Sequence, residues 1–174
     1  MNKKATSTTK PTVKVIGIGC GGNNIVNHLC QSDFESMSFV ACDMDAKVLE
    51  KSVAATTLQL GTDCLGSGNK SEKANFAAEE NVDAIKKLFT DKPSLTFVIT
   101  CLGGGCGTGA APVIACESKR WASRPLPSPL CLSSWKANAD SRKHWKESKT
   151  WPGKRMPYSC STTNTSKNDT ATNP

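Results

Sequence analysis

The sequence predicts an α/β fold with an incomplete Rossmann-like parallel sheet and helices on both of its faces. Two observations support this fold class. Apolar runs typical of buried strands alternate with segments of helical periodicity over residues 12–118. Glycine-rich loops follow the first, third and fourth of these apolar runs, at the sheet edge where parallel α/β folds bind ligands.

The first half of this region contains two predicted strand–helix units. Thr12–Gly19 (TVKVIGIG) is expected to be a buried strand that ends in glycines. Gly22–Gln31 has the apolar spacing of a helix. Met37–Asp43 is expected to be the second strand, and a short helix is expected over Asp45–Ser52.

The second half repeats this alternation. Thr56–Gly61 is expected to be the third strand, and a long helix is expected from Ser71, its cap, to Thr90, before Pro93. Leu95–Gly103 has the composition of a central parallel strand, and another helix is expected from about Thr108. The apolar face of the long helix is predicted to comprise Phe76, Val82, Ile85, Leu88 and Phe89.

Two of the glycine-rich loops have the design of a phosphate site. Gly17–Asn24 (GIGCGGNN) and Gly103–Gly109 (GGGCGTG) each join a predicted strand to a predicted helix. Such a turn directs unpaired N–H groups and the positive end of the helix dipole at one point. Two such loops at one sheet edge suggest a polyphosphate that is held from two sides.

The first loop alone permits a different ligand. Gly17, Gly19 and Gly22 match G-x-G-x-x-G, and Asp43 follows where a ribose-binding acid would lie, about twenty residues on. By itself, this loop therefore also fits a nicotinamide or flavin enzyme, or a glycine turn with a purely structural role.

The excess of positive charge in the chain is confined to its last third. Residues 1–118 contain 11 Lys, no Arg and 12 Asp and Glu, whereas residues 119–174 contain 11 Lys and Arg, 3 acids and all four Trp. The net charge of +7 therefore comes from residues 119–174. Trp interleaved with Lys and Arg would suit an arm that binds nucleic acid or a membrane surface.

The nine cysteines form no C-x-x-C pair, and the two histidines, His28 and His144, lie in the two unlike parts of the chain. We therefore expect reduced thiols in a cytoplasmic protein and no metal site. Residues 1–11 are predicted to be a disordered arm rather than a signal peptide, and no apolar run is long enough to span a membrane.

The second glycine loop decides between the ligands. GGGCGTG resembles the GGGTG(T/S)G signature of the tubulin/FtsZ superfamily, and the likeness to its FtsZ branch extends over Val13–Ala115. KVIGIGCGGNNIVNHL resembles the first phosphate loop and helix of that family, and FVACDMDAKVL resembles its AVNTDAQAL segment. LQLG, LGSGN and AAEE follow in the family's order. The dinucleotide interpretation leaves GGGCGTG unexplained.

The resemblance implies a nucleotide site made of three loops and one acid. Residues 66–69 would approach the γ-phosphate, residues 103–109 would wrap the phosphates, and Thr108 would contribute a hydroxyl contact. The implied site residues are Cys20, Gly21, Gly22, Asn23, Asn24, Asp45, Gly66, Ser67, Gly68, Asn69, Gly103, Gly104, Gly105, Cys106, Gly107, Thr108 and Gly109.

The chain also departs from the family pattern. Cys20 replaces a glycine, Cys106 replaces the first Thr of the signature, and Asp43 and Met44 replace Asn and Thr. The Leu65–Gly68 loop comes about three residues early. We interpret Cys106 as a tolerated replacement; the alternative is a reactive thiol, because thiols at helix N-termini acidify.

The family resemblance implies a role in cell division. Members bind GTP or GDP, with Mg²⁺ expected beside the nucleotide, between subunits that polymerise head to tail at the division site. Acids from the next subunit complete GTP hydrolysis there, so no catalytic residue is assigned to this chain. The expected partners are further FtsZ-type subunits, without nucleic acid or direct membrane insertion. Two alternatives are a fragment of a Rossmann NAD(P)-binding oxidoreductase and a non-catalytic fragment that caps full-length polymer.

Residues 119–174 do not continue the family pattern. If the gene is read from the third base of each codon, the codons of two adjacent residues together specify one new residue. Some of these new residues are fixed by the genetic code: Gly at Trp121–Ala122, Leu at His144–Trp145, and Glu at Trp135–Lys136 and Trp145–Lys146. The other codons permit the family's next strand and its EGK segment. We infer that one base is missing between codons 116 and 120 and that residues 119–174 are an out-of-frame, disordered basic tail without a strand. The domain at 12–118 is then a half-site, for which we expect marginal stability and weak or absent GTP binding.

Overall fold

The structure is a computed structural model of the whole chain. It describes residues 13–32, 34, 36–62, 65–121 and 130–135, the last of these by their backbone alone. The predicted arm at residues 1–11 and residues 122–129 and 136–174 of the predicted tail lie outside the described residues.

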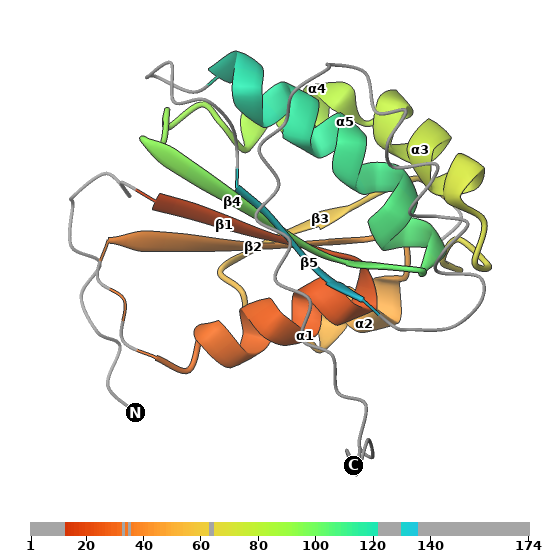
Figure 1. Cartoon of the computed structure of the whole chain (residues 1–174), viewed down its shortest axis with the longest axis horizontal. Coiled ribbons are helices and arrows are strands. Elements are labelled where there is room, and N and C mark those ends of the chain that lie inside the picture. Colours follow the sequence, from red (N-terminus) through yellow and green to blue (C-terminus); the bar gives the residue numbers. More distant parts are fainter. Residues whose placement is uncertain (1–12, 33, 35, 63–64, 122–129, 136–174) are drawn as a thin grey trace, which may run out of the picture.

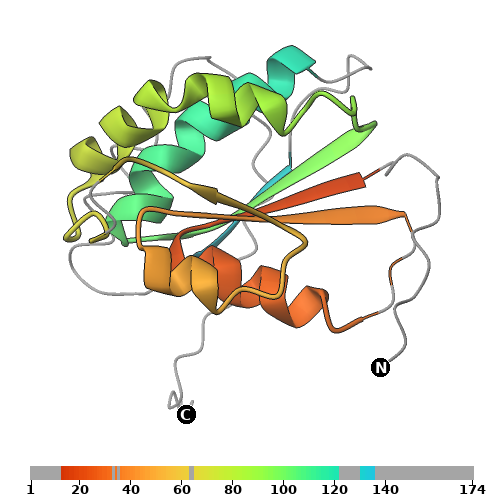
Figure 2. The ribbon, with the colours of Figure 1, turned by 180° about the vertical axis from the view of Figure 1, so that it is seen from behind.

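The described residues form one parallel sheet in the order β3-β2-β1-β4-β5. Helices α1 and α2 cover one face, and α3, α4 and α5 cover the other (Figures 1 and 2). The predicted fold class is confirmed. The elements are β1 (Val13–Ile18), α1 (Gly19–Leu29), β2 (Met37–Asp43), α2 (Ala46–Glu50), β3 (Thr56–Gln59), α3 (Ser71–Glu80), α4 (Val82–Lys87), β4 (Leu95–Leu102), α5 (Gly105–Trp121) and β5 (Leu130–Trp135).

The four predicted strands are present within two residues of their expected bounds, but two helices begin three residues early. α1 begins at Gly19 instead of Gly22, and α5 begins at Gly105 instead of Thr108. The glycines of each turn already have helical geometry, although glycine is a poor helix former. Both helix N-termini therefore lie closer to the ends of β1 and β4 than the sequence predicts.

The long helix predicted over residues 71–90 is wrong in three details. It is divided into α3 and α4 at Asn81, whose side-chain amide donates to the carbonyl of Ala77 at 2.8 Å. Lys70, not Ser71, is the N-cap residue, and no side chain caps the helix there. Phe76 is 62% exposed, because α3 packs closely on α5 through small residues. The buried residues of α3 are Ala74, Ala77 and Ala78.

The prediction that no strand follows residue 118 is wrong. α5 continues to Trp121, and β5 pairs with β4 in parallel from Phe97↔Leu130 to Leu102↔Trp135. Pairing of this kind uses backbone N–H and C=O groups, which every residue except proline provides. A segment without an alternating apolar pattern can therefore still occupy the open edge of β4.

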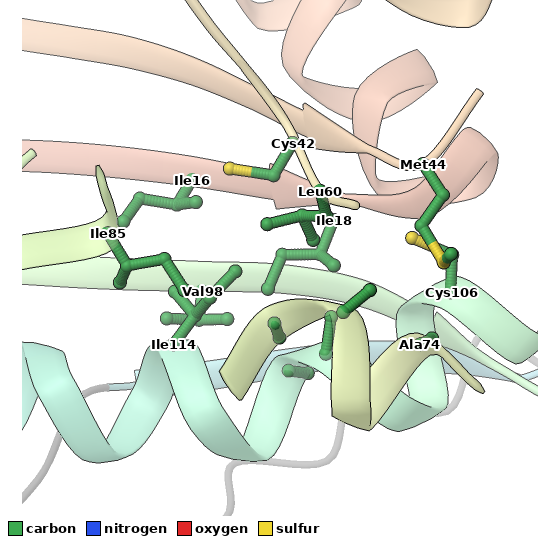
Figure 3. Close-up of a cluster of buried hydrophobic side chains, with 14 of the residues drawn as sticks. Ile16, Ile18, Cys42, Met44, Leu60, Ala74, Ile85, Val98, Cys106 and Ile114 are labelled. Carbon is green, nitrogen blue, oxygen red and sulfur yellow. The ribbon is translucent and has the colours of Figure 1, made fainter. Parts of the chain in front are cut away.

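The main core lies between the sheet and α3–α5 (Figure 3). Alternate residues of the strands reach it, such as Ile16 and Ile18 of β1 and Val98 of β4, and α5 contributes Ile114. A smaller cluster around Val26 of α1 covers the opposite face. Among the described residues, no helix has both the length and the apolar character needed to cross a membrane.

Candidate functional site

A cavity of about 500 Å³ opens at the carboxyl ends of the central strands. The last residues of three strands line it, namely Ile18 of β1, Asp43 of β2 and Leu102 of β4. This is the edge at which parallel α/β sheets bind ligands. The other lining residues are Gly19, Cys20, Gly21, Asn24, Asp45, Val48, Gly66, Ser67, Asn69, Cys101, Gly103, Gly104, Gly105, Cys106 and Gly107.

The turn that leads from β1 into α1 places four residues on the cavity wall. Gly19 has a φ of 74°, which favours glycine, and Cys20, Gly21 and Asn24 follow on the wall. Gly22 lies behind them, where a Cβ would stand 2.4 Å from the carbonyl oxygen of Ile99 in β4. The glycines of this turn therefore bring α1 close to β4 and leave the helix N-terminus facing the cavity.

The turn between β4 and α5 forms the opposite wall. Gly103 has a φ of 99°, and its N–H donates to Oγ1 of Thr108 at 3.2 Å. Gly104 faces open space, since a Cβ built on it meets no atom within 4 Å. A Cβ on Gly105 would stand 2.4 Å from Oγ of Ser67. The third loop of the site, residues 65–70, therefore packs directly on this turn.

The third loop is attached to the site at both ends. Leu65 forms an isolated antiparallel bridge with Asp45, and Lys70 N–H donates to the carbonyl of Ser67 at 3.1 Å. Gly66, Gly68 and Asn69 have φ values of 76°, 57° and 61°. Three left-handed residues fold the loop into a tight curve over the cavity.

Asp43 lies at the centre of the site and is only 4% exposed. Its Oδ1 accepts from the backbone N–H of Met44 at 2.7 Å and of Asp45 at 3.1 Å. Its Oδ2 accepts from Nδ2 of Asn23 at 3.3 Å. Burial raises the pKa of Asp43 above its usual value, and these hydrogen bonds partly offset that rise.

Cys106 is a buried thiol in the first turn of α5 and points toward Met44 (Figure 3). Burial and the nearby Asp43 carboxylate raise its pKa to about 12. The alternative of a reactive, acidified Cys106 is therefore wrong, because desolvation outweighs the helix N-terminus. Cys20, which lines the same cavity from the α1 turn, is exposed.

Twelve of the seventeen residues implied by the family resemblance line the cavity. The other five are Gly22, Asn23, Gly68, Thr108 and Gly109. Asn23 is buried and links α1 to β2 through the carbonyl of Cys42 at 3.1 Å, and the Thr108 hydroxyl lies behind the turn that it supports. Sequence reasoning did not place Ile18, Leu102 and Val48 on the wall, although the ends of the predicted strands indicated the first two.

The groups of the cavity that suit an anion belong to its backbone. No Lys or Arg is among the described residues that line it, and Asp43 and Asp45 are its only charged side chains. The N-termini of α1 and α5 both face it, and neither helix has an acid in its first turn. Unpaired N–H groups and helix dipoles favour phosphate. Within the described part of the chain, no three His, Cys, Asp or Glu side chains are grouped to hold a metal ion.

Comparison with known proteins agrees with this arrangement. The model of the Tubulin/FtsZ family, GTPase domain, matches residues 12–126. The FtsZ cell division protein of Buchnera aphidicola is 42% identical over 111 residues, which are 62% of this chain and 29% of that protein. The FtsZ of Pseudomonas putida is 39% identical over 127 residues, or 67% of this chain and 32% of that protein. The chain thus spans about a third of the relatives that it matches.

Solved structures show the same similarity. An empty FtsZ dimer from M. jannaschii superposes with a TM-score of 0.68 at 28% identity, over 82% of this chain and 43% of that one. CetZ2 from Haloferax volcanii, at 19% identity and a TM-score of 0.66, shares the fold. The chain belongs to the Tubulin/FtsZ family and carries the N-terminal part of its GTPase domain.

Proposed function

We propose that this chain is the phosphate-binding half of an FtsZ-type GTPase domain and that its cavity holds the phosphates of GTP or GDP. The observation that carries this proposal is the convergence of two glycine turns and two helix N-termini on one cavity lined by all three loops. The proposed contacts are the backbone N–H groups around residues 19–21 and 104–107. Mg²⁺ would accompany the nucleotide and offset the charge of Asp43 and Asp45.

We propose that the complete protein works in cell division, as an FtsZ-type subunit that polymerises with further copies in the cytoplasm. Hydrolysis of GTP would take place between subunits, with the catalytic acids supplied by the next one. The described residues offer binding groups and no assigned catalytic group. We therefore expect the chain alone to hold nucleotide weakly and not to turn it over.

The proposed binding is tested with a matched pair of alanine substitutions. Gly104→Ala places a methyl group in the open space of the cavity. Gly68→Ala also places its methyl group where no protein atom lies within 4 Å, but Gly68 does not line the cavity. The φ of Gly68 is 57°, so its substitution carries a backbone strain of about 1 kcal/mol that Gly104→Ala does not. Isothermal titration of GTP with Mg²⁺ should show weaker binding for Gly104→Ala than for Gly68→Ala. Equal affinities would count against phosphate binding on the α5 turn.

Two other functions give different results in the same assays. An NAD(P)-binding fragment would bind NADH tightly and would not respond to GTP. A fragment that caps polymer would slow the assembly of full-length FtsZ when it is added at a small molar fraction, as measured by light scattering. We favour the GTP site, because GGGCGTG forms the cavity wall that a dinucleotide site based on Gly17–Gly22 would leave without a role.

We also propose that residues 119–174 are read out of frame. The forced Gly, Leu and two Glu codons support this proposal, while the pairing of β5 with β4 does not require family sequence. Resequencing the gene from codon 110 past codon 174 tests it. A restored base would replace these residues with the family's next strand and EGK segment, whereas an unchanged reading of the same 174 codons would mean that the base is absent from the gene itself.

A further inference from the structure

The side chain of Asn23, in the first glycine loop, reaches the end of β2 instead of the cavity. Asn23 is 1% exposed and does not line the cavity. Its Nδ2 donates to the carbonyl oxygen of Cys42 at 3.1 Å and to Oδ2 of Asp43 at 3.3 Å. Cys42 and Asp43 are the last two residues of β2. The family resemblance implies that Asn23 holds the nucleotide, but in the structure its side chain holds the second strand.

A further set of bonds continues from the end of β2 to the third loop, residues 65–70. Oδ1 of Asp43 accepts from the backbone N–H groups of Met44 at 2.7 Å and of Asp45 at 3.1 Å, so the carboxylate fixes the turn into α2. Asp45 then forms an antiparallel bridge with Leu65, the first residue of the third loop. The first glycine loop, the turn after β2 and the third loop all carry residues of the cavity wall. Hydrogen bonds thus connect three parts of the wall in series.

We propose that Asn23 and Asp43 are a positioning pair, which fixes the third loop relative to the first glycine loop and thereby sets the shape of the nucleotide cavity. Neither side chain has to contact the nucleotide for this role. Because the third loop packs on the α5 turn at Gly105, its position also affects the opposite wall. The functional part of the inference rests on the proposed GTP site, whereas the connection itself rests on the hydrogen bonds and the β-bridge of the structure.

The donors and acceptors show what an amide at position 23 provides. A side-chain amide nitrogen carries two hydrogens, and both of its partners here, a backbone carbonyl and a carboxylate, only accept. Oδ1 of Asn23 is buried and has no hydrogen-bond partner among the described residues. A buried polar atom without a partner is unfavourable, so the amide is oriented by its nitrogen and not by its oxygen. An aspartate at this position would have the same size and would present only acceptors to the two acceptors.

The mismatch in Asn23→Asp can be relieved from position 43. In the double variant Asn23→Asp/Asp43→Asn, the amide nitrogen at position 43 donates to the carboxylate at position 23, while the amide oxygen still accepts from the N–H groups of the turn. The bond to the Cys42 carbonyl is not restored, so the repair is incomplete. The matched control is Asn23→Asp/Asp45→Asn, which has the same total charge but places no donor next to residue 23, because Asp45 offers its side chain to the N–H of Lys47.

The test uses the full chain, these two double variants, Asn23→Asp and Asn23→Ala. Asn23→Ala removes both bonds of residue 23 without adding a charge, and it keeps the test available if Asn23→Asp does not fold. Hydrogen–deuterium exchange is measured without nucleotide in peptides that cover residues 43–46, 65–70 and 110–115. Residues 110, 111, 114 and 115 are buried in α5, so the last peptide reports opening of the whole core. GTP affinity with Mg²⁺ is measured by titration on the same samples.

We expect Asn23→Asp and Asn23→Ala to raise exchange by about tenfold in residues 43–46 and 65–70, which corresponds to the loss of one charge-assisted hydrogen bond. Exchange of residues 110–115 should change by less than about twofold, because a local opening at these loops leaves the core closed. Asp43→Asn should bring the Asn23→Asp chain to within about threefold of the unaltered chain, whereas Asp45→Asn should not. GTP affinity should fall and recover in the same order.

Equal recovery in the two double variants would overturn the proposal, because charge alone would then explain the effect. Faster exchange confined to residues 43–46 would overturn it by showing no connection to the third loop, and a rise of equal size in residues 110–115 would do so by showing general unfolding. An unchanged GTP affinity in Asn23→Ala, when the unaltered chain binds GTP, would overturn the role in the site. If no protein in the set binds GTP while the exchange pattern and its repair remain, the nucleotide proposal fails and the positioning pair stands.

Discussion

The turn before α1 and the turn before α5 both begin with a left-handed glycine, Gly19 at φ 74° and Gly103 at φ 99°, and both lead a helix N-terminus to the same cavity. Their surroundings differ. A Cβ on Gly21 or Gly22 of the α1 turn would lie mainly against β4, at Cys101 and Ile99, and that of Gly22 would also meet Gly17 of β1 at 3.4 Å. The glycines of the α5 turn contact the third loop, the ends of β1 and β4, and helix α3.

This difference separates packing glycines from ligand-facing glycines. Gly107 would place a Cβ 2.4 Å from Oγ1 of Thr100, and Gly109 would place one 2.0 Å from the carbonyl oxygen of Ser71. Of the cavity-lining glycines Gly104, Gly105 and Gly107, only Gly104 has no protein atom within 4 Å of its Cβ position. Most glycines of the family signature are therefore explained by close packing, and Gly104 by the open space of the cavity.

The largest effect is expected from Gly109→Ala. The added methyl group would overlap the backbone of α3 at Ser71, which cannot move without displacing the helix. We expect a loss of stability of about 3 kcal/mol, or failure to fold. Urea unfolding monitored by circular dichroism measures the change. A loss below about 1 kcal/mol would show that α3 and α5 are farther apart than described here.

The α1 turn should tolerate one of its two comparable substitutions better than the other. Gly22→Ala meets a backbone carbonyl at 2.4 Å, whereas Gly21→Ala meets the side chain of Cys101 at 2.3 Å. Side chains move more readily than strands, so we expect about 2 kcal/mol for Gly22→Ala and about 1 kcal/mol for Gly21→Ala. Cys101→Ala removes the Sγ atom but leaves Cβ, which lies 2.7 Å from the Cβ position of Gly21. Repeating both substitutions in that background should therefore lower, without abolishing, the cost of Gly21→Ala only; an unchanged cost would contradict the clash with Sγ.

The thiols of the two turns should differ in reactivity. Cys20 is exposed, whereas Cys106 is buried and its pKa is raised to about 12. At neutral pH, iodoacetamide should modify Cys20 in the native chain and should modify Cys106 only after denaturation, as read by peptide mass spectrometry. Protection of Cys20 by GTP would add support for the proposed site. Equal native labelling of both thiols would contradict the burial of the α5 turn.

The same thiol predicts a dependence of stability on pH. The pKa of Cys106 is about 12 in the folded chain, against an ordinary value of 9.0. The folded state therefore holds more protons than the unfolded state between these values, and stability should fall as the pH rises through that window. Cys106→Ser should make the fall shallower in urea titrations between pH 8 and pH 11. An identical slope in the two proteins would assign the effect to other groups, such as Cys42, whose pKa burial also raises.

The smallest change in stability is expected from Gly104→Ala, within about 0.5 kcal/mol, because its methyl group enters open space. Thermal unfolding of the unliganded chain measures this. A large loss would show that the α5 turn is packed at Gly104 as well, and the distinction between the two kinds of glycine would fail.

Local sequence predicted the strands well and the contacts between elements poorly. The apolar run Leu95–Leu102 could be predicted as a strand, because Pro93 before it and Gly103 after it mark its ends in the sequence. The early starts of α1 and α5 could not be predicted from the sequence, because tertiary packing overrides the low helix propensity of glycine. The break at Asn81 coincides with a hydrogen bond from its side-chain amide to the carbonyl of Ala77, which no sequence pattern indicates.

The site was predictable to the same extent. Glycine loops between strands and helices indicated the cavity, and the strand ends indicated its edge. The hydrogen bond between Asn23 and Asp43 joins residues that are 20 positions apart in the sequence, and no local pattern reveals such a contact. Asn23 had been recognised as a residue of the first glycine loop, and Asp43 as a possible ribose-binding acid and a departure from the family pattern. The edge strand β5 was missed for a related reason, since backbone pairing leaves little trace in the side chains.

The position of β1 in the middle of the sheet has a consequence for synthesis on the ribosome. β1 can pair with β2 soon after residue 43 emerges, but its other edge waits for β4, whose first partner is Leu95. Residues 101–107 complete the cavity only after that. A nascent chain stalled before β4 has left the exit tunnel would thus expose the free edge of β1 and the first glycine turn to chaperones and proteases. The binding site would form only once residues 101–107 have emerged.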